Sequence, residues 1–175
     1  EQLEARIEAL LRPFERQLEL LQTIPGWKSH VAPAVLAEIG VDMTVFPSEA
    51  HLASWAGVCP GNNESAGKHR SGRTRPGNRW LRRVLTQGAW AATHQRNSYL
   101  ASFYRRLVKR RGKKRAVVAL SHTMLTIAYH VLRTGRPYQE LGAAYLDQLN
   151  PERTSRALVR RLEALGFRVT LQAAA

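Results

Sequence analysis

The sequence predicts a mainly α-helical fold, and three observations support this prediction. Apolar residues recur at spacings of three and four along most of the 175 residues, which is the period of one helix face. Gly and Pro residues divide this pattern into segments of helical length. The hydrophobic share of 44% is that of an ordinary globular protein with a buried core. The expected architecture is a long N-terminal helix, a helix–hairpin–helix element, a basic Gly/Ser loop and a helical bundle.

The first 22 residues predict a long helix with one apolar stripe. Pro13 falls inside the stripe and is expected to kink the helix. The stripe can be a packing face within the domain or a coiled-coil-like seam. We expect residues 1–22 to form a helical connector. The stripe consists of Leu3, Ile7, Leu10, Phe14, Leu18 and Leu21.

The next segment predicts two helices joined by a tight turn at Pro25-Gly26. The second helix should accommodate Pro33 in its first turn and end at Gly40. This arrangement is typical of a helix–hairpin–helix element, in which turn amides bind a backbone phosphate without contacting a base. Gly26 and Lys28 are therefore candidate nucleic-acid contacts, and an ordinary helical hairpin is the alternative.

A short helix is expected after Ser48, whose side chain can cap it, and Gly57 should end it. The one cysteine, Cys59, follows this helix. A single cysteine excludes an internal disulfide framework and a cysteine zinc cluster. Because the sequence defines no cationic partner for Cys59, we expect a buried structural thiol and not a nucleophile.

Residues 60–83 predict a polar loop that leads into a helix capped by Asn78. A serine flanked by glycine and several cations suits phosphoryl transfer. The cations stabilise charge on the attacked phosphate, and glycine lets the backbone approach it closely. Ser65 and Ser71 are the two candidate nucleophiles. The alternative is a phosphate-binding loop whose serines are inert.

Further helices are expected at residues 79–95, 98–111, 114–133 and about 152–165. In the first of them, we assign Trp80 to the buried stripe together with Leu81 and Leu85. Aromatic side chains at helical spacing are in general assigned to the core, although they could also stack on bases. Residues 167–171 predict at most one short C-terminal strand.

Positive charge is concentrated in the second part of the chain, and the net charge is +14. Residues 1–49 carry 4 basic and 8 acidic side chains, whereas residues 50–175 carry 23 and 5. This density favours binding to DNA or RNA phosphates, with a solvated basic face as the alternative. An anionic membrane surface is a weaker rival. Beside the hairpin pair, the candidate nucleic-acid contacts are Lys68, Arg70, Arg73, Arg75, Asn78, Arg79, Arg82, Arg83, Lys109, Arg110, Arg111, Lys113, Lys114 and Arg115.

Other function classes find little support in the sequence. No apolar run reaches the length of a membrane span, and no signal peptide is visible, so we expect a cytoplasmic protein without a membrane partner. His122 and His130 are too far apart for a zinc pair one helical turn apart, and we expect no metal site in this chain.

Several separated motifs occur in the order found in one family of insertion-sequence transposases. They read IPG…AEIG, then FPS…LASWAGVCP, then ESAGKHRSGRTRPGNRWLR, and finally AYHVLRTGRPYQELGAAY. From about residue 3 to 168, the chain resembles the C-terminal transposase domain of enzymes that are guided by a bridge RNA. These enzymes also carry an N-terminal RuvC-like domain.

The resemblance implies that Ser65, the first serine of SAGKHRSG, is the catalytic nucleophile. The Ser-Gly pair of the family reads Ser65-Ala66 here, whereas Ser71-Gly72 keeps the unbroken pair, so Ser71 remains the alternative. Cations near the serine would hold the DNA backbone, namely Arg79, Arg82 and Arg83.

The resemblance also implies DNA, a guide RNA and further copies of the protein as partners. The metal-binding acidic cluster of the family has no match here, so we expect it in an upstream domain that binds Mg²⁺. No cofactor is expected in this chain, which alone should bind nucleic acid without recombining it. The implied division is a connector at 1–22, the transposase domain at 23–150 and a helical tail at 151–175. The rival interpretations are a non-catalytic DNA- or RNA-binding module and a structure-specific nuclease or junction-binding protein.

Overall fold

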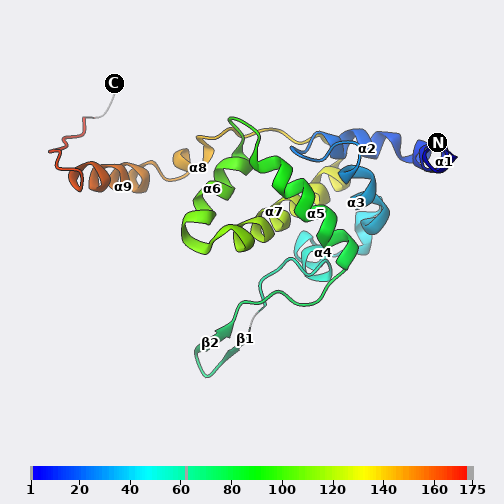
Figure 1. Cartoon of the computed structure of the whole chain (residues 1–175), viewed down its shortest axis with the longest axis horizontal. Coiled ribbons are helices and arrows are strands. Elements are labelled where there is room, and N and C mark those ends of the chain that lie inside the picture. The colour runs from blue at the N-terminus through cyan, green and yellow to red at the C-terminus, as the bar shows by residue number, and fades with distance from the viewer. Residues whose placement is uncertain (1, 62, 173–175) are drawn as a thin grey trace.

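The computed structural model describes residues 2–61 and 63–172, and its central helix is α7 (Lys113–Thr134) (Figure 1). Four helices pack around α7, namely α5 (Arg79–Thr93), α6 (Tyr99–Arg111), α4 (Glu49–Trp55) and α2 (Glu15–Gln22). The mainly helical fold is confirmed, as are the helices expected at 79–95, 98–111 and 114–133. None of the described helices has both the length and the apolar character that a membrane crossing requires.

Helix α7 forms the middle of the core because its apolar face is buried from Ala116 to Val131. Tyr129 lies on this face and is fully buried. Its hydroxyl donates a hydrogen bond to the Phe46 carbonyl oxygen at 3.1 Å and accepts one from Arg133 Nη1 at 2.9 Å. This polar group is therefore satisfied inside the core, and it ties α7 to the segment that precedes α4.

The N-terminal stripe is divided between exposed and buried residues. Helix α1 (Gln2–Leu11) is followed by a 3-10 turn at Arg12–Phe14 and then by α2. Pro13 lies in the 3-10 turn, so the predicted kink is confirmed. Only the α2 half of the stripe, Leu18 and Leu21, is buried, whereas α1 extends away from the bundle and exposes Leu3, Ile7 and Leu10 (Figure 1).

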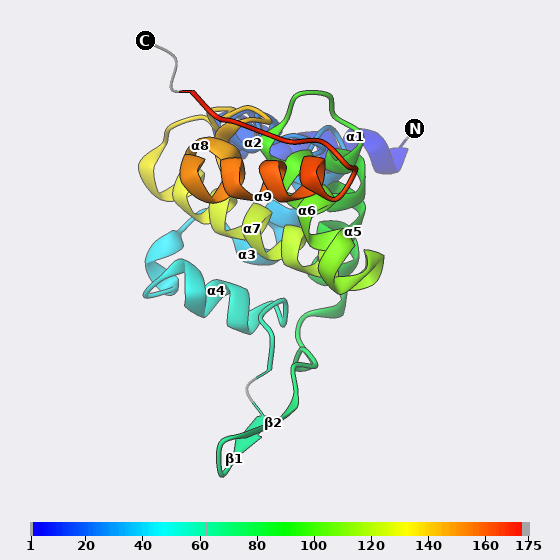
Figure 2. The same cartoon turned by 90° about the vertical axis from the view of Figure 1, so that its left-hand side faces the viewer.

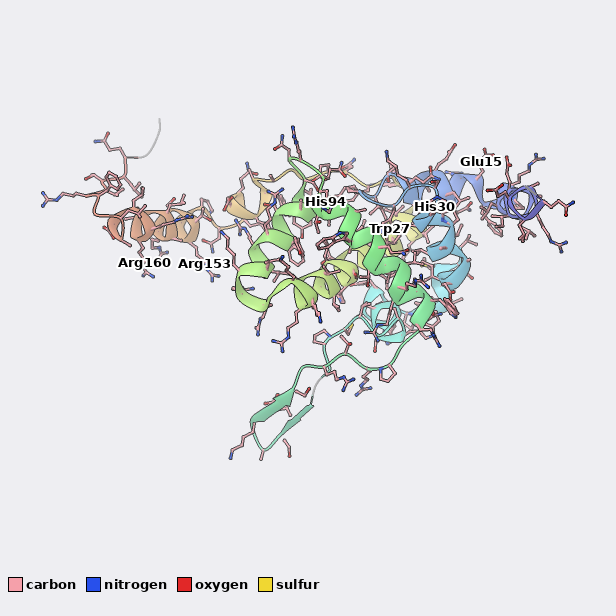
Figure 3. The ribbon with its side chains drawn as sticks, viewed as in Figure 1. Glu15, Trp27, His30, His94, Arg153 and Arg160 are labelled. Atoms are coloured by element: carbon pink, nitrogen blue, oxygen red, sulfur yellow. The ribbon has the colours of Figure 1, made fainter. Side chains whose placement is uncertain are left out.

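Helices α2 and α3 (Val31–Ile39) form the predicted helical hairpin. Trp27 in its turn is fully buried and lies between α3 and α5 (Figure 3). A Cβ built on Gly88 of α5 would lie 2.7 Å from the Trp27 ring, and one built on Gly26 would lie 2.4 Å from the Gly88 oxygen. Both glycines are thus required by packing within the protein. Whether the turn also binds phosphate stays a prediction.

The strands of the structure lie elsewhere than the sequence indicated. Residues 63–71, expected as loop, contain a short antiparallel hairpin of β1 (Asn63–Ser65) and β2 (Lys68–Ser71). Residues 167–171, for which the sequence predicted at most one short strand, contain no strand. Two helices, α8 (Tyr145–Gln148) and α9 (Pro151–Glu163), precede this segment, and α9 packs against α8.

Candidate nucleic-acid interface

A β-hairpin projects from one side of the helical bundle, and we call residues 58–76 the arm (Figures 1 and 2). The arm leaves the bundle between α4 and α5, where its two segments cross closely. A Cβ on Gly57 would lie 2.8 Å from Gly77, and one on Gly77 would lie 2.4 Å from the Ala56 oxygen. Farther out, Gly61 N donates to the Arg73 carbonyl oxygen at 3.2 Å. Because glycine has no side chain, the two segments can approach each other closely where the arm leaves the bundle. We call this crossing at Gly57 and Gly77 the neck.

Ser65 lies at the tip of the arm. It is exposed and pairs with Lys68 across a two-residue turn made by Ala66 and Gly67. Ala66 has φ +52° and Gly67 has φ +72°, as expected for the turn type that suits tight β-hairpins. The turn therefore places Ser65 in the last strand pair before the tip of the arm.

Ser71 lies at the far end of β2 from the turn. It is half-buried, and its Oγ accepts a hydrogen bond from Arg73 N at 3.1 Å. The hydroxyl of Ser71 therefore takes part in a local turn that shapes the arm. Of the two candidate serines, Ser65 is the more accessible to a large substrate.

The arm is cationic along its length. Lys68, Arg73 and Arg75 are exposed, whereas the side chain of Arg70 lies outside the described part of the structure. Arg82 of α5 supports the base of the arm, because Nη2 donates to Thr74 Oγ1 at 3.2 Å. Its Nη1 reaches the Arg75 carbonyl oxygen at 3.5 Å.

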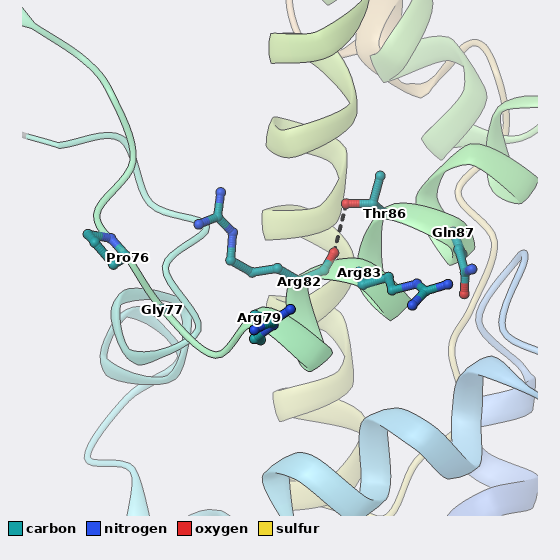
Figure 4. A pocket seen from close by; sticks show the side chains of 7 residues that line it. All are labelled: Pro76, Gly77, Arg79, Arg82, Arg83, Thr86 and Gln87. Atoms are coloured by element: carbon teal, nitrogen blue, oxygen red, sulfur yellow. Dashed lines mark hydrogen bonds between the residues drawn. The ribbon is translucent and has the colours of Figure 1, made fainter.

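Helix α5 begins beside the neck. Asn78 caps it as predicted, because its Oδ1 accepts hydrogen bonds from Trp80 N at 2.9 Å and Leu81 N at 3.0 Å. Its Nδ2 donates to Glu38 of α3, so the cap is itself held in place. The first turns of α5 line a concave pocket of about 630 Å³ (Figure 4). The pocket is lined by Pro76, Gly77, Arg79, Arg82, Arg83, Thr86 and Gln87.

A second cationic surface lies where α6 meets α7, on the side of the bundle from which the arm projects (Figures 1 and 2). Six predicted nucleic-acid contacts are exposed around Gly112, which has φ +78° and ends α6. We call them the basic corner: Lys109, Arg110, Arg111, Lys113, Lys114 and Arg115. Two candidate phosphate-binding surfaces, the arm and the corner, therefore share one side of the molecule.

The thiol of Cys59 is half-buried near the neck. Burial raises its pKa, so the protonated thiol dominates at neutral pH. A thiolate nucleophile is not favoured at this position. Across residues 2–61 and 63–172, no group of three His, Cys, Asp or Glu side chains could hold a metal ion. A magnesium-binding acidic cluster therefore does not fit the side chains described here.

The assignment of Trp80 to the core was wrong. Its side chain is 58% exposed, and Trp90 on the same helix is 49% exposed. Leu81 and Leu85, assigned to the same stripe, are fully buried. The helical period could have indicated this exposure. The buried stripe passes through residues 81, 85, 88, 89 and 92, and position 80 lies about 100° away from position 81 around the helix, at or beyond the edge of the stripe.

Comparison with known proteins gives consistent matches. Residues 18–105 match the family model described as the IS116/IS110/IS902 transposase family. A pilin gene-inverting protein of Moraxella bovis is 32% identical over 130 residues, which are 73% of this chain and 40% of that protein. An uncharacterized 43.6 kDa protein of insertion element IS110 from Streptomyces coelicolor is 30% identical over 138 residues, 78% of this chain and 34% of that protein. A putative transposase of Sinorhizobium fredii is 30% identical over 125 residues, 69% of this chain and 32% of that protein. The chain thus spans 32% to 40% of the length of these relatives.

Proposed function

The chain belongs to the IS116/IS110/IS902 family of transposases, and we propose that it supplies a serine nucleophile for DNA strand exchange. The nucleophile is Ser65. The observation that carries this proposal is the exposed position of Ser65 at the tip of a cationic arm that is anchored by a close glycine crossing. A hydroxyl in this position can reach a phosphodiester without requiring DNA to enter the bundle.

In the proposed reaction, Ser65 Oγ attacks the phosphorus atom of a DNA phosphodiester and forms a new O–P bond. The bond from phosphorus to one deoxyribose oxygen breaks, and that oxygen keeps the electron pair and takes up a proton. The serine proton passes to a base or to water. The hydroxyl of a second strand then attacks the phosphoserine, joins the strands and restores the serine, so the bond energy is conserved.

The cations of the arm supply binding and charge stabilisation in this scheme. Lys68 is paired with Ser65 across the turn, and Arg73 and Arg75 lie exposed along the same arm. Preorganised cations beside the attacked phosphate stabilise the charge that develops there. The basic corner would hold a more distant stretch of the nucleic-acid backbone.

The proposal also includes partners beyond this chain. A bridge RNA would guide the choice of target, and an upstream RuvC-like domain would hold Mg²⁺, which can neutralise charge on the scissile phosphate. Several copies would assemble to bring two DNA molecules together, and the exposed residues of α1 are the candidate contact: Leu3, Ile7 and Leu10.

The test uses the full-length transposase that carries this chain, with guide RNA, Mg²⁺ and end-labelled target DNA. Reactions are denatured in detergent, and a protein–DNA adduct is sought as a band of reduced mobility. We expect Ser65→Ala to abolish the band and Ser71→Ala, the matched control, to retain it. Each variant is also assayed for DNA binding, which both should keep.

Three other results would contradict the proposal in different ways. Loss of the band only in Ser71→Ala would transfer the nucleophile to that residue. DNA cleavage without an adduct in any protein would favour a nuclease. Tight, salt-sensitive binding with neither cleavage nor adduct would favour a non-catalytic binding module.

A further inference from the structure

The outer face of α5 carries two tryptophans that are about half exposed. Trp80 is 58% exposed and Trp90 is 49% exposed, although tryptophan is on average a highly buried residue. Ten residues separate them, which is about 15 Å along the helix. Arg83 and Gln87 lie between them on the same exposed side of the helix. Isolated exposed apolar side chains are common, but two large indoles on one polar helix face call for a partner.

Both indoles are held in place before any partner binds. The Trp90 ring makes edge contacts with Tyr104 of α6 at 6.3 Å and with His94 at 5.5 Å between ring centroids. The Arg79 guanidinium lies over the Trp80 ring, 5.3 Å from its centroid. A preorganised ring loses little conformational entropy when a planar group stacks on it. His94, labelled in Figure 3, marks the end of this face nearest the α5–α6 turn.

The charge around the indoles limits the class of partner. Helix α5 contains no acidic residue, and three arginines line the concave pocket at its beginning (Figure 4). Tryptophan and arginine also occur at protein–protein interfaces, but a face with several arginines and no acidic residue has the electrostatic character that attracts a polyanion. Aromatic rings interleaved with arginines are the features that single-stranded nucleic acids use, with stacked bases and neutralised phosphates.

We infer that the outer face of α5 binds single-stranded DNA or RNA, with unpaired bases stacked on Trp80 and Trp90. Phosphates between these bases contact Arg83 and Arg79 at the pocket. A duplex does not suit this face, because its base faces are covered by stacking within the helix. The inference rests on the proposed function only for nucleic acid as the class of partner; it does not depend on Ser65 or on covalent chemistry.

The experiment measures binding of the 175-residue chain to a fluorescein-labelled single-stranded oligonucleotide and to the duplex of the same sequence. We expect Trp80→Ala and Trp90→Ala each to weaken single-strand binding about tenfold, the usual size of a lost base–aromatic stack, and to change duplex binding less than about twofold. The salt dependence should stay the same, because no phosphate contact is removed. Trp80→Phe should recover part of the affinity.

Trp55→Ala is the matched control. Trp55 is 45% exposed, lies on a different helix, α4, and packs against Phe46 with ring centroids 5.7 Å apart. We expect this variant to bind single strands as the unsubstituted chain does. Circular dichroism of all four variants checks that the bundle remains folded.

The inference is overturned if single-strand affinity is unchanged in both α5 variants, or if Trp55→Ala lowers it equally. It is also overturned if the α5 variants change only the oligomeric state, because the face would then be a protein interface. The adduct assay measures covalent attachment of the protein to DNA, which is a different event from the binding of a single strand by α5. A transposase that forms no adduct can still bind single strands through α5, and one that forms it can fail to do so.

Discussion

In both the helical bundle and the arm, glycines allow two parts of the chain to approach closely, but the structural results differ. In the bundle, Gly26 and Gly88 make room for Trp27, so one part of the chain packs against another. At the neck, Gly57 and Gly77 bring two segments together. Beyond the neck, none of the described side chains from residue 64 to 76 is buried. Packing within the protein therefore accounts for the buried residues of the bundle, whereas the serine and cations of the arm are exposed and available to an external partner.

The largest expected effect tests the bundle side of this comparison. Trp27→Ala should lower the free energy of unfolding by about 3–5 kcal/mol, because a fully buried large side chain is removed from a closely fitted site. Its Nε1 has no hydrogen-bond partner among the described residues, so the contribution is packing and not polar. Urea unfolding followed by circular dichroism measures the change.

The matched control for that experiment is Trp80→Ala, which removes the same side chain from a position that is 58% exposed. It should change the free energy of unfolding by less than about 0.5 kcal/mol. Equal losses of unfolding free energy in the two variants would show that the stability of the bundle does not depend on the packing of Trp27 against α5.

The second prediction tests the arm. Replacing Arg73 and Arg75 by Gln should reduce the slope of log affinity for DNA against log salt by about 1.8, because two phosphate contacts are lost. Near 0.1 M salt the same loss lowers affinity roughly 60-fold. Stability should be unchanged, since both side chains are exposed. Fluorescence anisotropy titrations at several salt concentrations give the slope.

The control for the arm is a pair of arginines on α9. Arg153 and Arg160 are exposed, seven residues apart and on the same side of that helix (Figure 3). Replacing both by Gln removes the same charge from a surface that lies away from the arm. An equal drop in the slope would mean that net charge, and not the arm, determines binding.

These two regions also differ in how well the sequence predicts them. Helices of the bundle were predicted closely because their ends depend on local chemistry, such as the Asn78 cap, the Ser98 cap and the left-handed Gly135. The burial of Trp80 was predicted wrongly. The spacing of apolar residues shows that a helix has a buried face, but the direction of that face must also be known before a residue such as Trp80 can be assigned to it. Residues 63–71 have low strand propensity, and their pairing arises from the Ala66-Gly67 turn and the glycine neck.

The site was predicted as a set of residue types but not as a geometry. The sequence indicated Ser65, Ser71 and the surrounding cations as one polar loop. It could not separate a serine at the tip of a hairpin from a serine bonded within a turn, because that difference depends on the strand register. The exposed indoles of α5 were likewise hidden, since exposure depends on which neighbouring helices cover a face.

The third prediction concerns the junction of the two regions. Asn78→Ala should destabilise the protein by about 1 kcal/mol, because two backbone N–H groups at the start of α5 lose their acceptor. Ser48→Ala is the control: Ser48 precedes α4 in the same position but makes no capping bond, and its hydroxyl contacts His51 Nδ1 at 2.8 Å instead. Thermal unfolding compares the two, and a loss in Ser48→Ala as large as in Asn78→Ala would count against the cap as the cause.

The smallest expected effect lies at the tip of the arm. Ala66 has φ +52°, a left-handed conformation that costs a non-glycine residue about 1–2 kcal/mol. Ala66→Gly removes this strain and should slow amide exchange in β2 (Lys68–Ser71) by up to about fivefold, less than the full strain because glycine also gains freedom when the arm opens. Gly67→Ala, with φ +72° at the next position, should have the opposite effect. Global stability should stay constant in both, since residues 66 and 67 are exposed and lie outside the core. If Ala66→Gly accelerated exchange instead, the tip would not be held by this turn, and the exposed position of Ser65 would need another explanation.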